Sequence, residues 1–212
     1  MRTLAIDCAT ENCSAALFDD GALVAGECRL LGRGHAEHLI PMIARLPERG
    51  KAGRIAVSLG PGSFTGVRIG LAAARALALA WNAQVVGYPT LALVAAMARA
   101  QSSGAQSNSA QGVSVAMTGG HGEWFVQDFT ADGAPQTSLA SLRPADAAAA
   151  VGHDCIAGSQ AEALVALRGH GTPIPLLPDA RRFPLLGDAA LLQDIAPLYG
   201  RPPDAKLPGA KT

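Results

Sequence analysis

A glycine-rich turn contains the residues whose types and spacing could most directly do chemistry: Gly60-Pro61-Gly62-Ser63-Phe64-Thr65-Gly66. It lies where a short apolar run ends and a helical pattern begins. Backbone N–H groups and a helix dipole can hold an anion at such a position. Asp7 and Thr10, which close the first apolar run, could add a carboxylate and a hydroxyl. The candidate nucleotide or anion site therefore comprises seven residues: Asp7, Thr10, Gly60, Gly62, Ser63, Thr65 and Gly66.

This turn fits none of the established nucleotide or nucleophile motifs. A P-loop and a dinucleotide fingerprint both require glycine where the chain has Thr65, and the P-loop lysine is also missing. A nucleophile elbow around Ser63 fails at the same position, which leaves a peptidase with little support. The alternative is a structural turn, with glycines for positive φ and Thr65 as the helix cap. Spacing alone favours this alternative.

Metal-ion and acid–base sites have weaker signals. His35 and His38 lie one helical turn apart, but no third ligand is identifiable, so we expect a polar helix start and no metal site. No second acid accompanies Asp7, and we assign no catalytic residue. The segment 119–123, Gly-Gly-His-Gly-Glu, is typical of a turn between two strands.

The elements that must position these residues follow the order βββαβαβα in the first half of the chain. Three short strands form an antiparallel meander, and two further strands alternate with helices, which indicates a mixed sheet with helices on its faces. We expect strands at 3–7, 13–18, 22–30, 55–59 and 85–86, and helices at 35–46, 67–81 and 91–99, the last capped by Thr90.

The second half predicts a smaller α/β lobe. We expect strands at 113–117, 123–129 and 155–157, and helices at 145–151, 160–167 and 185–195. A polar stretch without apolar periodicity separates the halves. The predicted organisation is an N-terminal lobe at 1–100, a linker at 101–112, a C-terminal lobe at 113–200 and an extended tail at 201–212.

Two helices of the first lobe are more apolar than one sheet can cover. The second of them, 67–81, carries only Arg68 and Arg75 as charges, seven positions apart and so on nearly the same side. A helix that is apolar almost all round is covered on more than one face. Its second covering is either the C-terminal lobe or another subunit, and an ordinary core helix remains the alternative.

Composition narrows the function classes. The 17 Lys and Arg residues balance 17 Asp and Glu residues, which argues against a stand-alone nucleic-acid binder or a polybasic membrane-surface protein. The 49% hydrophobic content excludes disorder for most of the chain. The most apolar stretch is interrupted by Arg75 and Asn82, so we expect no membrane span. Without a signal-peptide pattern, we expect a cytoplasmic protein with four reduced cysteines.

The residues Leu4-Ala5-Ile6-Asp7-Cys8-Ala9-Thr10-Glu11, the segment from Gly60 to Gly70 and Lys206-Leu207-Pro208-Gly209 resemble the TsaB (YeaZ-type) family. This family supplies the dimerisation subunit of the bacterial tRNA threonylcarbamoyladenosine (t6A) machinery. The resemblance is close over residues 1–100 and loose beyond them. It implies an actin-like (ASKHA, ribonuclease-H-like) fold, in agreement with the element order.

The resemblance also implies a non-catalytic scaffold. Such a subunit pairs with a catalytic TsaD subunit and a TsaE ATPase, which together modify N6 of adenosine 37 in tRNAs reading ANN codons. The catalytic relative carries two metal-binding histidines at positions that correspond here to Thr90 and Val94. We expect homodimers when the partner is absent, little direct tRNA binding, and no cofactor apart from ATP or ADP at the partner interface. An actin-like nucleotide-binding enzyme of the ATPase or kinase type, acting through Gly60–Gly66, is the alternative.

The family's pairing surface is implied to be the first two helices. The residues carried over to it are His35, His38, Leu39, Met42, Ile43, Leu46, Arg68, Leu71, Ala72, Arg75 and Leu79. The chain departs from the family at Thr118–Glu123, where an Asp-Ala-Arg-like segment is usual. A shorter C-terminal lobe would leave more helix surface uncovered, which favours pairing.

Overall fold

The computed structural model describes residues 1–102 and 112–200. The predicted tail at 201–212 and most of the predicted linker lie outside the described residues. The first lobe contains β1 (Arg2–Asp7), β2 (Asn12–Asp19), β3 (Ala22–Leu30), α1 (His35–Arg45), η1 (Pro47–Gly50), β4 (Arg54–Ser58), α2 (Phe64–Trp81), β5 (Gln84–Tyr88) and α3 (Thr90–Ser102). This order confirms the predicted βββαβαβα pattern, and the short 3₁₀ turn η1 is the one addition.

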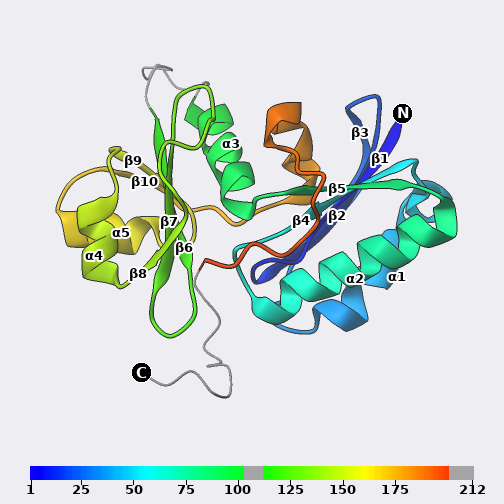
Figure 1. Cartoon of the computed structure of the whole chain (residues 1–212), viewed down its shortest axis with the longest axis horizontal. Helices are drawn as coiled ribbons and strands as arrows, with labels where there is room; N and C mark the ends of the chain where they lie inside the picture. Colours follow the sequence, from blue (N-terminus) through cyan, green and yellow to red (C-terminus); the bar gives the residue numbers. More distant parts are fainter. Residues whose placement is uncertain (103–111, 201–212) are drawn as a thin grey trace, which may run out of the picture.

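The strands of the first lobe form one sheet in the order β3-β2-β1-β4-β5. The first three strands are the predicted antiparallel meander, and β4 and β5 run parallel to β1. Parallel neighbours require crossovers, and α1 and α2 supply them on a single face of the sheet (Figure 1). The carboxyl ends of β1 and β4 therefore meet at the same edge of the sheet.

Alternating side chains of the central strands divide the first lobe into two cores. Leu4 and Ile6 of β1 pack with the buried faces of α1 and α2, while Ala5 faces the opposite core, which contains Leu93 of α3. The small side chain of Ala5 allows a close approach of the elements on that face. The central strands are thus covered on both faces, which agrees with their almost uninterrupted apolar sequence.

The second lobe contains β6 (Val113–Thr118), β7 (Trp124–Phe129), β8 (Ala140–Leu142), α4 (Pro144–Ala150), β9 (Cys155–Ala157), α5 (Ala161–Arg168) and β10 (Thr172–Ile174). Its sheet has the order β10-β9-β6-β7-β8. Side chains of α3 pack with the core formed by β6 and β7, and α4 and α5 cover the other face (Figure 1). The two edge strands β8 and β10 have three residues each and were not predicted.

The end of the chain returns to the first lobe. After two 3₁₀ turns, η2 (Ala180–Leu185) and η3 (Asp188–Ala190), the return segment, residues 191–200, runs along the first sheet and α2. Leu192 pairs with Gly87 beside β5, and the Leu198 amide donates to the Leu59 carbonyl over 2.8 Å. The predicted helix at 185–195 is therefore wrong. Leu192 and Ile195 instead lie in an extended segment that packs on the core beneath α1 and α2, and Pro184 and Gly187 disfavour a continuous helix.

The helix α2 is long and apolar enough to cross a membrane. It is the one helix among the described residues of which this is true. This differs from the expectation based on Arg75 and Asn82. The core helix of a water-soluble protein passes the same test, so the observation is weak evidence for a membrane. Here Val67, Leu71, Ala74 and Ala78 of α2 lie in the core beneath it.

Candidate functional site

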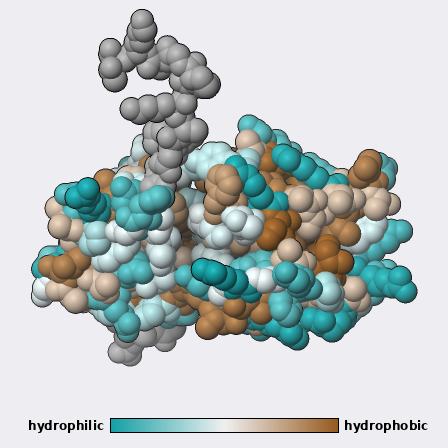
Figure 2. All heavy atoms as spheres, turned by 90° about the horizontal axis from the view of Figure 1, so that it is seen from below, coloured by the Kyte–Doolittle hydropathy of each residue, from teal (hydrophilic) through white to brown (hydrophobic). Residues whose placement is uncertain are grey.

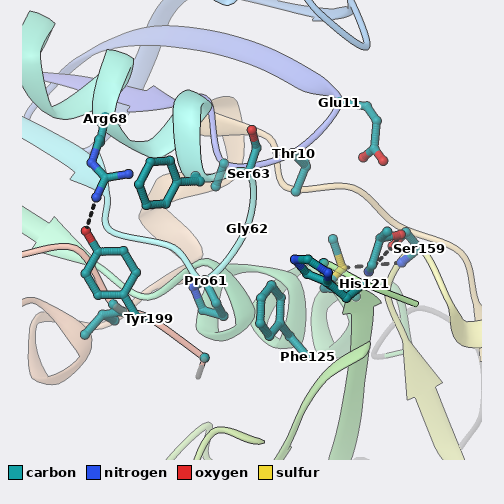
Figure 3. A pocket seen from close by; sticks show the side chains of 18 of the residues that line it. Thr10, Glu11, Pro61, Gly62, Ser63, Arg68, His121, Phe125, Ser159 and Tyr199 are labelled. Carbon is teal, nitrogen blue, oxygen red and sulfur yellow. Dashed lines mark hydrogen bonds between the residues drawn. The ribbon is translucent and has the colours of Figure 1, made fainter. Parts of the chain in front are cut away.

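A cleft of about 720 Å³ opens between the two lobes, next to the glycine-rich turn. The first lobe contributes the β1–β2 turn (residues 9–11) and residues 61–64. The second lobe contributes residues 117–121, Phe125 and Ser159, and the return segment closes one side with residues 198–200. Figure 3 shows Phe125, Pro61 and Tyr199 along its apolar side, with Thr10 and Glu11 at the opposite, polar side.

The carboxylate of Asp7 is fully buried and does not line this cleft. It accepts a hydrogen bond from the Ala9 amide (3.0 Å) and another from the Tyr88 hydroxyl (3.1 Å). Burial raises the pKa of Asp7 from 3.8 to about 6, against the opposing effect of these hydrogen bonds. Burial also raises the pKa of Tyr88 well above its usual value. Asp7 and Tyr88 thus form a buried polar contact between β1 and β5, and neither side chain lines the cleft.

The glycines of the 60–66 turn allow two backbone segments to touch. A Cβ atom on Gly62 would lie 2.0 Å from the Ala9 carbonyl oxygen, and one on Gly66 would lie 2.0 Å from the Cys8 carbonyl oxygen. The Ser63 amide donates to the Ala9 carbonyl over 2.7 Å, and the Gly66 amide donates to the Ser63 hydroxyl. The helix cap is thus Ser63. The prediction of Thr65 was wrong because α2 begins at Phe64, three residues before the predicted start at 67, so Thr65 lies inside the helix.

The seven residues of the predicted nucleotide or anion site are only partly brought together. Thr10, Gly62 and Ser63 line the cleft, while Asp7, Gly60, Thr65 and Gly66 do not. The amides of Ser63 and Gly66 already have acceptors within the protein. The Ser63 amide joins the glycine-rich turn to the β1–β2 turn and the Gly66 amide caps α2, so fewer donors remain for an anion than the motif suggested.

Arg68 and Arg75 hold the return segment. Arg68 donates a hydrogen bond to the Tyr199 hydroxyl over 2.6 Å (Figure 3). Its guanidinium also lies over the Phe64 ring. Arg75 donates to the Ile195 carbonyl (3.2 Å). The prediction that both arginines share one side of the helix is confirmed. Their contacts within the chain are a different role from the predicted contact with a partner.

Six residues of the predicted pairing surface are buried within the chain and are unavailable to a partner as the surface stands: His35, Leu39, Met42, Ile43, Leu46 and Leu71. They form the inner faces of α1 and α2, because the apolar stripe of an amphipathic helix packs on its own sheet first. For these six residues the predicted contact with a partner is therefore corrected.

The outer faces of the two helices remain exposed and are unusually apolar. Leu79 on α2 is 88% exposed and Ile40 on α1 is 48% exposed. Small apolar residues surround them on the same faces, namely Ala36, Pro41, Ala44, Ala72, Ala76 and Ala80. We call this set the outer helix face. Figure 2, seen from below, shows hydrophobic side chains interspersed with hydrophilic ones over this side of the first lobe.

His35 anchors the β1–β2 turn to α1. Its Nε2 lies 2.8 Å from the Thr10 carbonyl oxygen and 3.2 Å from the Asn12 carbonyl oxygen, so this nitrogen carries the proton. His38 is exposed on the same helix. Among the described residues no three His, Cys, Asp or Glu side chains group as a metal site. The four cysteines are free, and the Cys8 and Cys13 sulfurs lie 3.7 Å apart.

Three groups of cleft residues were not predicted. Residues 119–121 form the expected turn between β6 and β7, and they also line the cleft. Ser159 and the return segment come from parts of the chain far from the glycine-rich turn. The glycines around His121 were the one sequence signal that could have indicated these cleft residues, because a turn at the end of a strand often borders a ligand site. Nothing in the local sequence indicates that Tyr199 reaches Arg68.

Comparisons with known proteins agree with this architecture. A family model described as "TsaD: tRNA N6-adenosine threonylcarbamoyltransferase" matches residues 29–192. The chain is 43% identical over 100 residues to the tRNA threonylcarbamoyladenosine biosynthesis protein TsaB of Escherichia coli K12, a match over 45% of this chain and 43% of the relative. It is 35% identical over 97 residues to TsaB of Haemophilus influenzae, with 43% and 41% covered. These matches span less than half the length of the curated relatives.

Two solved structures cover nearly the whole chain. YeaZ from Pseudomonas aeruginosa has a TM-score of 0.74 at 26% identity, over 93% of this chain and 99% of that one. A second Pseudomonas aeruginosa structure, described as similar to the peptidase YeaZ, has a TM-score of 0.75 at 28% identity, over 94% and 99%. The expected actin-like α/β fold and the resemblance to TsaB are confirmed. The chain belongs to the family of the tRNA N6-adenosine threonylcarbamoyltransferase TsaD, and within it is similar to the TsaB (YeaZ-type) t6A biosynthesis proteins.

Proposed function

We propose that the chain is a non-catalytic pairing subunit for t6A formation. In this role it binds a TsaD-type catalytic subunit, works with a TsaE-type ATPase, and supports threonylcarbamoylation of N6 of adenosine 37 in tRNAs reading ANN codons. The relatives named TsaB and the match to the TsaD family support this place in the pathway. The cytoplasm is where such a subunit would meet its tRNA substrate.

The outer helix face is the observation that carries the proposal. Leu79 stands almost fully exposed on a helix whose outer surface carries Ala72, Ala76 and Ala80, with Arg75 one turn before it. Small residues let two helices approach closely, and a protruding leucine can fill a pocket on the opposite protein. Exposed apolar residues gathered on two neighbouring helices are typical of a subunit interface. The same face would allow a homodimer when the catalytic subunit is absent.

The state of the cleft supports a non-catalytic role. Asp7 is the one acid in the predicted nucleotide or anion site. Its carboxylate is buried and accepts hydrogen bonds from the Tyr88 hydroxyl and the Ala9 amide. The turn itself uses the Ser63 and Gly66 amides for internal hydrogen bonds. General base catalysis at Asp7 would require a substrate proton within hydrogen-bond distance of a carboxylate that the cleft does not reach.

Light scattering after size-exclusion chromatography tests the proposal. The purified chain, mixed at micromolar concentration with the TsaD-type protein of the same organism, should elute with the mass of a heterodimer. The chain alone should elute as a homodimer that the partner dissociates. If the mixture shows only the separate proteins, the proposal is wrong.

Nucleotide binding by the chain itself is the second candidate, because the turn at Gly62 and Ser63 does border a cleft. Titration calorimetry with ATP and Mg²⁺ distinguishes the two functions. We expect no micromolar binding by the isolated chain and allow ATP or ADP only in the assembled complex. Micromolar binding by the isolated chain would favour the enzyme.

A further inference from the structure

A second cavity extends the interlobe cleft into a groove. This cavity, of about 540 Å³, shares Glu11, Thr118 and Ser159 with the cleft. It continues past the ends of β6 and β9 to Leu176 and Leu177. The interlobe groove, defined as these two cavities together, runs from Tyr199 past Glu11 to Leu177.

Glu11 gives the middle of the groove a negative charge. In the described part of the chain no ion pair or side-chain hydrogen bond involves its carboxylate, which points across the groove towards Ser159 (Figure 3). The polar groups around it are already hydrogen-bonded to one another. The Thr118 amide donates to the Ser159 hydroxyl (2.9 Å), and the Gln160 side-chain amide donates to the Thr118 hydroxyl (2.8 Å). A cation is therefore the group that this position accommodates best.

Apolar side chains lie on both sides of this charge. Phe125, Pro61 and Met117 line the cleft side, and Leu176 with Leu177 line the other. In an extended polypeptide, side chains on the same face recur about every 7 Å. A basic side chain at Glu11 with apolar neighbours on either side would match the order of these groups. A phosphate would not, because Glu11 repels it and Arg68 is held by Tyr199.

We propose that the interlobe groove binds an extended segment of the partner protein, with a lysine or arginine at Glu11 between two apolar side chains. This inference rests on the proposed pairing function. Phe64 and Arg68 line the groove and lie in the first turns of α2, so the groove adjoins the N-terminal end of a helix that presents the outer helix face. The charge of Glu11 and the continuity with α2 together identify a basic-apolar peptide as the occupant.

Selection from a phage-displayed library of random heptapeptides tests the groove without the partner. Three full-length forms serve as targets: wild type, Glu11→Lys, and Glu162→Lys as a control on the exposed face of α5. We expect wild type and Glu162→Lys to enrich peptides with a basic residue between apolar ones. Glu11→Lys should lose this enrichment, with at least tenfold weaker binding of the selected peptides. Equal enrichment by Glu11→Lys, or no basic enrichment by wild type, would overturn the proposal.

Binding of the TsaD-type partner tests the source of the segment. Glu11→Lys should weaken the heterodimer at least tenfold, and Glu162→Lys should leave it unchanged. If Glu11→Lys pairs as tightly as wild type, the partner does not occupy the groove, although pairing through the helices stands. If wild type forms no heterodimer, the proposed function itself fails, and the peptide selection still reports on the groove alone.

Discussion

The guanidinium of Arg68 donates a hydrogen bond of 2.6 Å to the hydroxyl of Tyr199, which lies 131 positions later in the chain. Seven residues along the same helix, Arg75 donates to the Ile195 carbonyl. The helix that presents the outer helix face therefore also holds the segment that closes the cleft. A partner that displaces α2 would move the border of the cleft with it.

Substitution of Leu79 by glutamate should disrupt pairing. Leu79 is 88% exposed in the single chain, so the change leaves folding intact, but in a complex it would place an unpaired charge in an apolar contact. We expect at least about a tenfold loss of affinity, or about 1.4 kcal/mol, for the TsaD-type partner by light scattering or calorimetry. Leu167→Glu on α5, also an exposed leucine, is the matched control and should pair normally.

Substitution of Asp7 by asparagine should stabilise the protein at neutral pH. The folded pKa of about 6 exceeds the ordinary value of 3.8, so between these values the folded state binds more protons than the unfolded state. The free energy of unfolding therefore falls as pH rises through this range, by about 3 kcal/mol once Asp7 is ionised. Asparagine removes this loss and keeps an oxygen for the Ala9 amide.

Thermal unfolding followed by circular dichroism from pH 4 to pH 8 measures the effect. Asp7→Asn should have a higher Tm than wild type at pH 8, and the difference should shrink towards pH 4, where Asp7 is protonated in wild type. A difference that stays constant with pH would show that burial of the charge is not its cause.

Gly66→Ala should destabilise the fold severely. The new Cβ would lie 2.0 Å from the Cys8 carbonyl oxygen, a backbone atom that cannot move without displacing β1. We expect a loss of about 3 kcal/mol or more in urea unfolding, although alanine is the better helix former. Gly53→Ala is the control, since no heavy atom lies within 4 Å of its added Cβ. A similar stability for both variants would contradict the close contact.

Tyr199→Phe should loosen the return segment without unfolding the protein. The change removes the hydrogen bond from Arg68 and keeps the ring beside Phe64. We expect several-fold faster amide hydrogen exchange at residues 195–200, including the Leu198 amide, with a Tm close to that of wild type. Unchanged exchange would mean that Leu198 and Leu192 hold the segment by themselves.

The strands and helices of the first lobe could be predicted because their apolar periodicity is strong and local. The same periodicity misled the assignment of the pairing surface. Leu39 and Met42 are conspicuous in the sequence because they face the core, whereas the outer face is marked by alanines and by Leu79. Residues 185–195 look helical, yet the sheet edge at Gly87 and the first core accept them as an extended segment.

The candidate site was harder to predict than the fold. The turn at 60–66 stood out through its glycines. Glycine is required there because the backbone contacts the carbonyl groups of Cys8 and Ala9, which no local pattern reveals. The place of Asp7 depends on Tyr88, which lies 81 positions away in the sequence and encloses the carboxylate from β5. Glu11 gains its significance from a second cavity formed by the other lobe.

The return of the chain end to the first lobe affects how the protein folds during synthesis. The ribosome makes β1 to β5 before the second lobe, but Leu192, Ile195 and Leu198, which pack on the core of the first lobe, are made only after the second lobe. The first lobe is therefore completed by a segment that is synthesised after the second lobe. Until then β5 lacks its pairing partner at Gly87, and the nascent first lobe exposes apolar side chains that the return segment later covers.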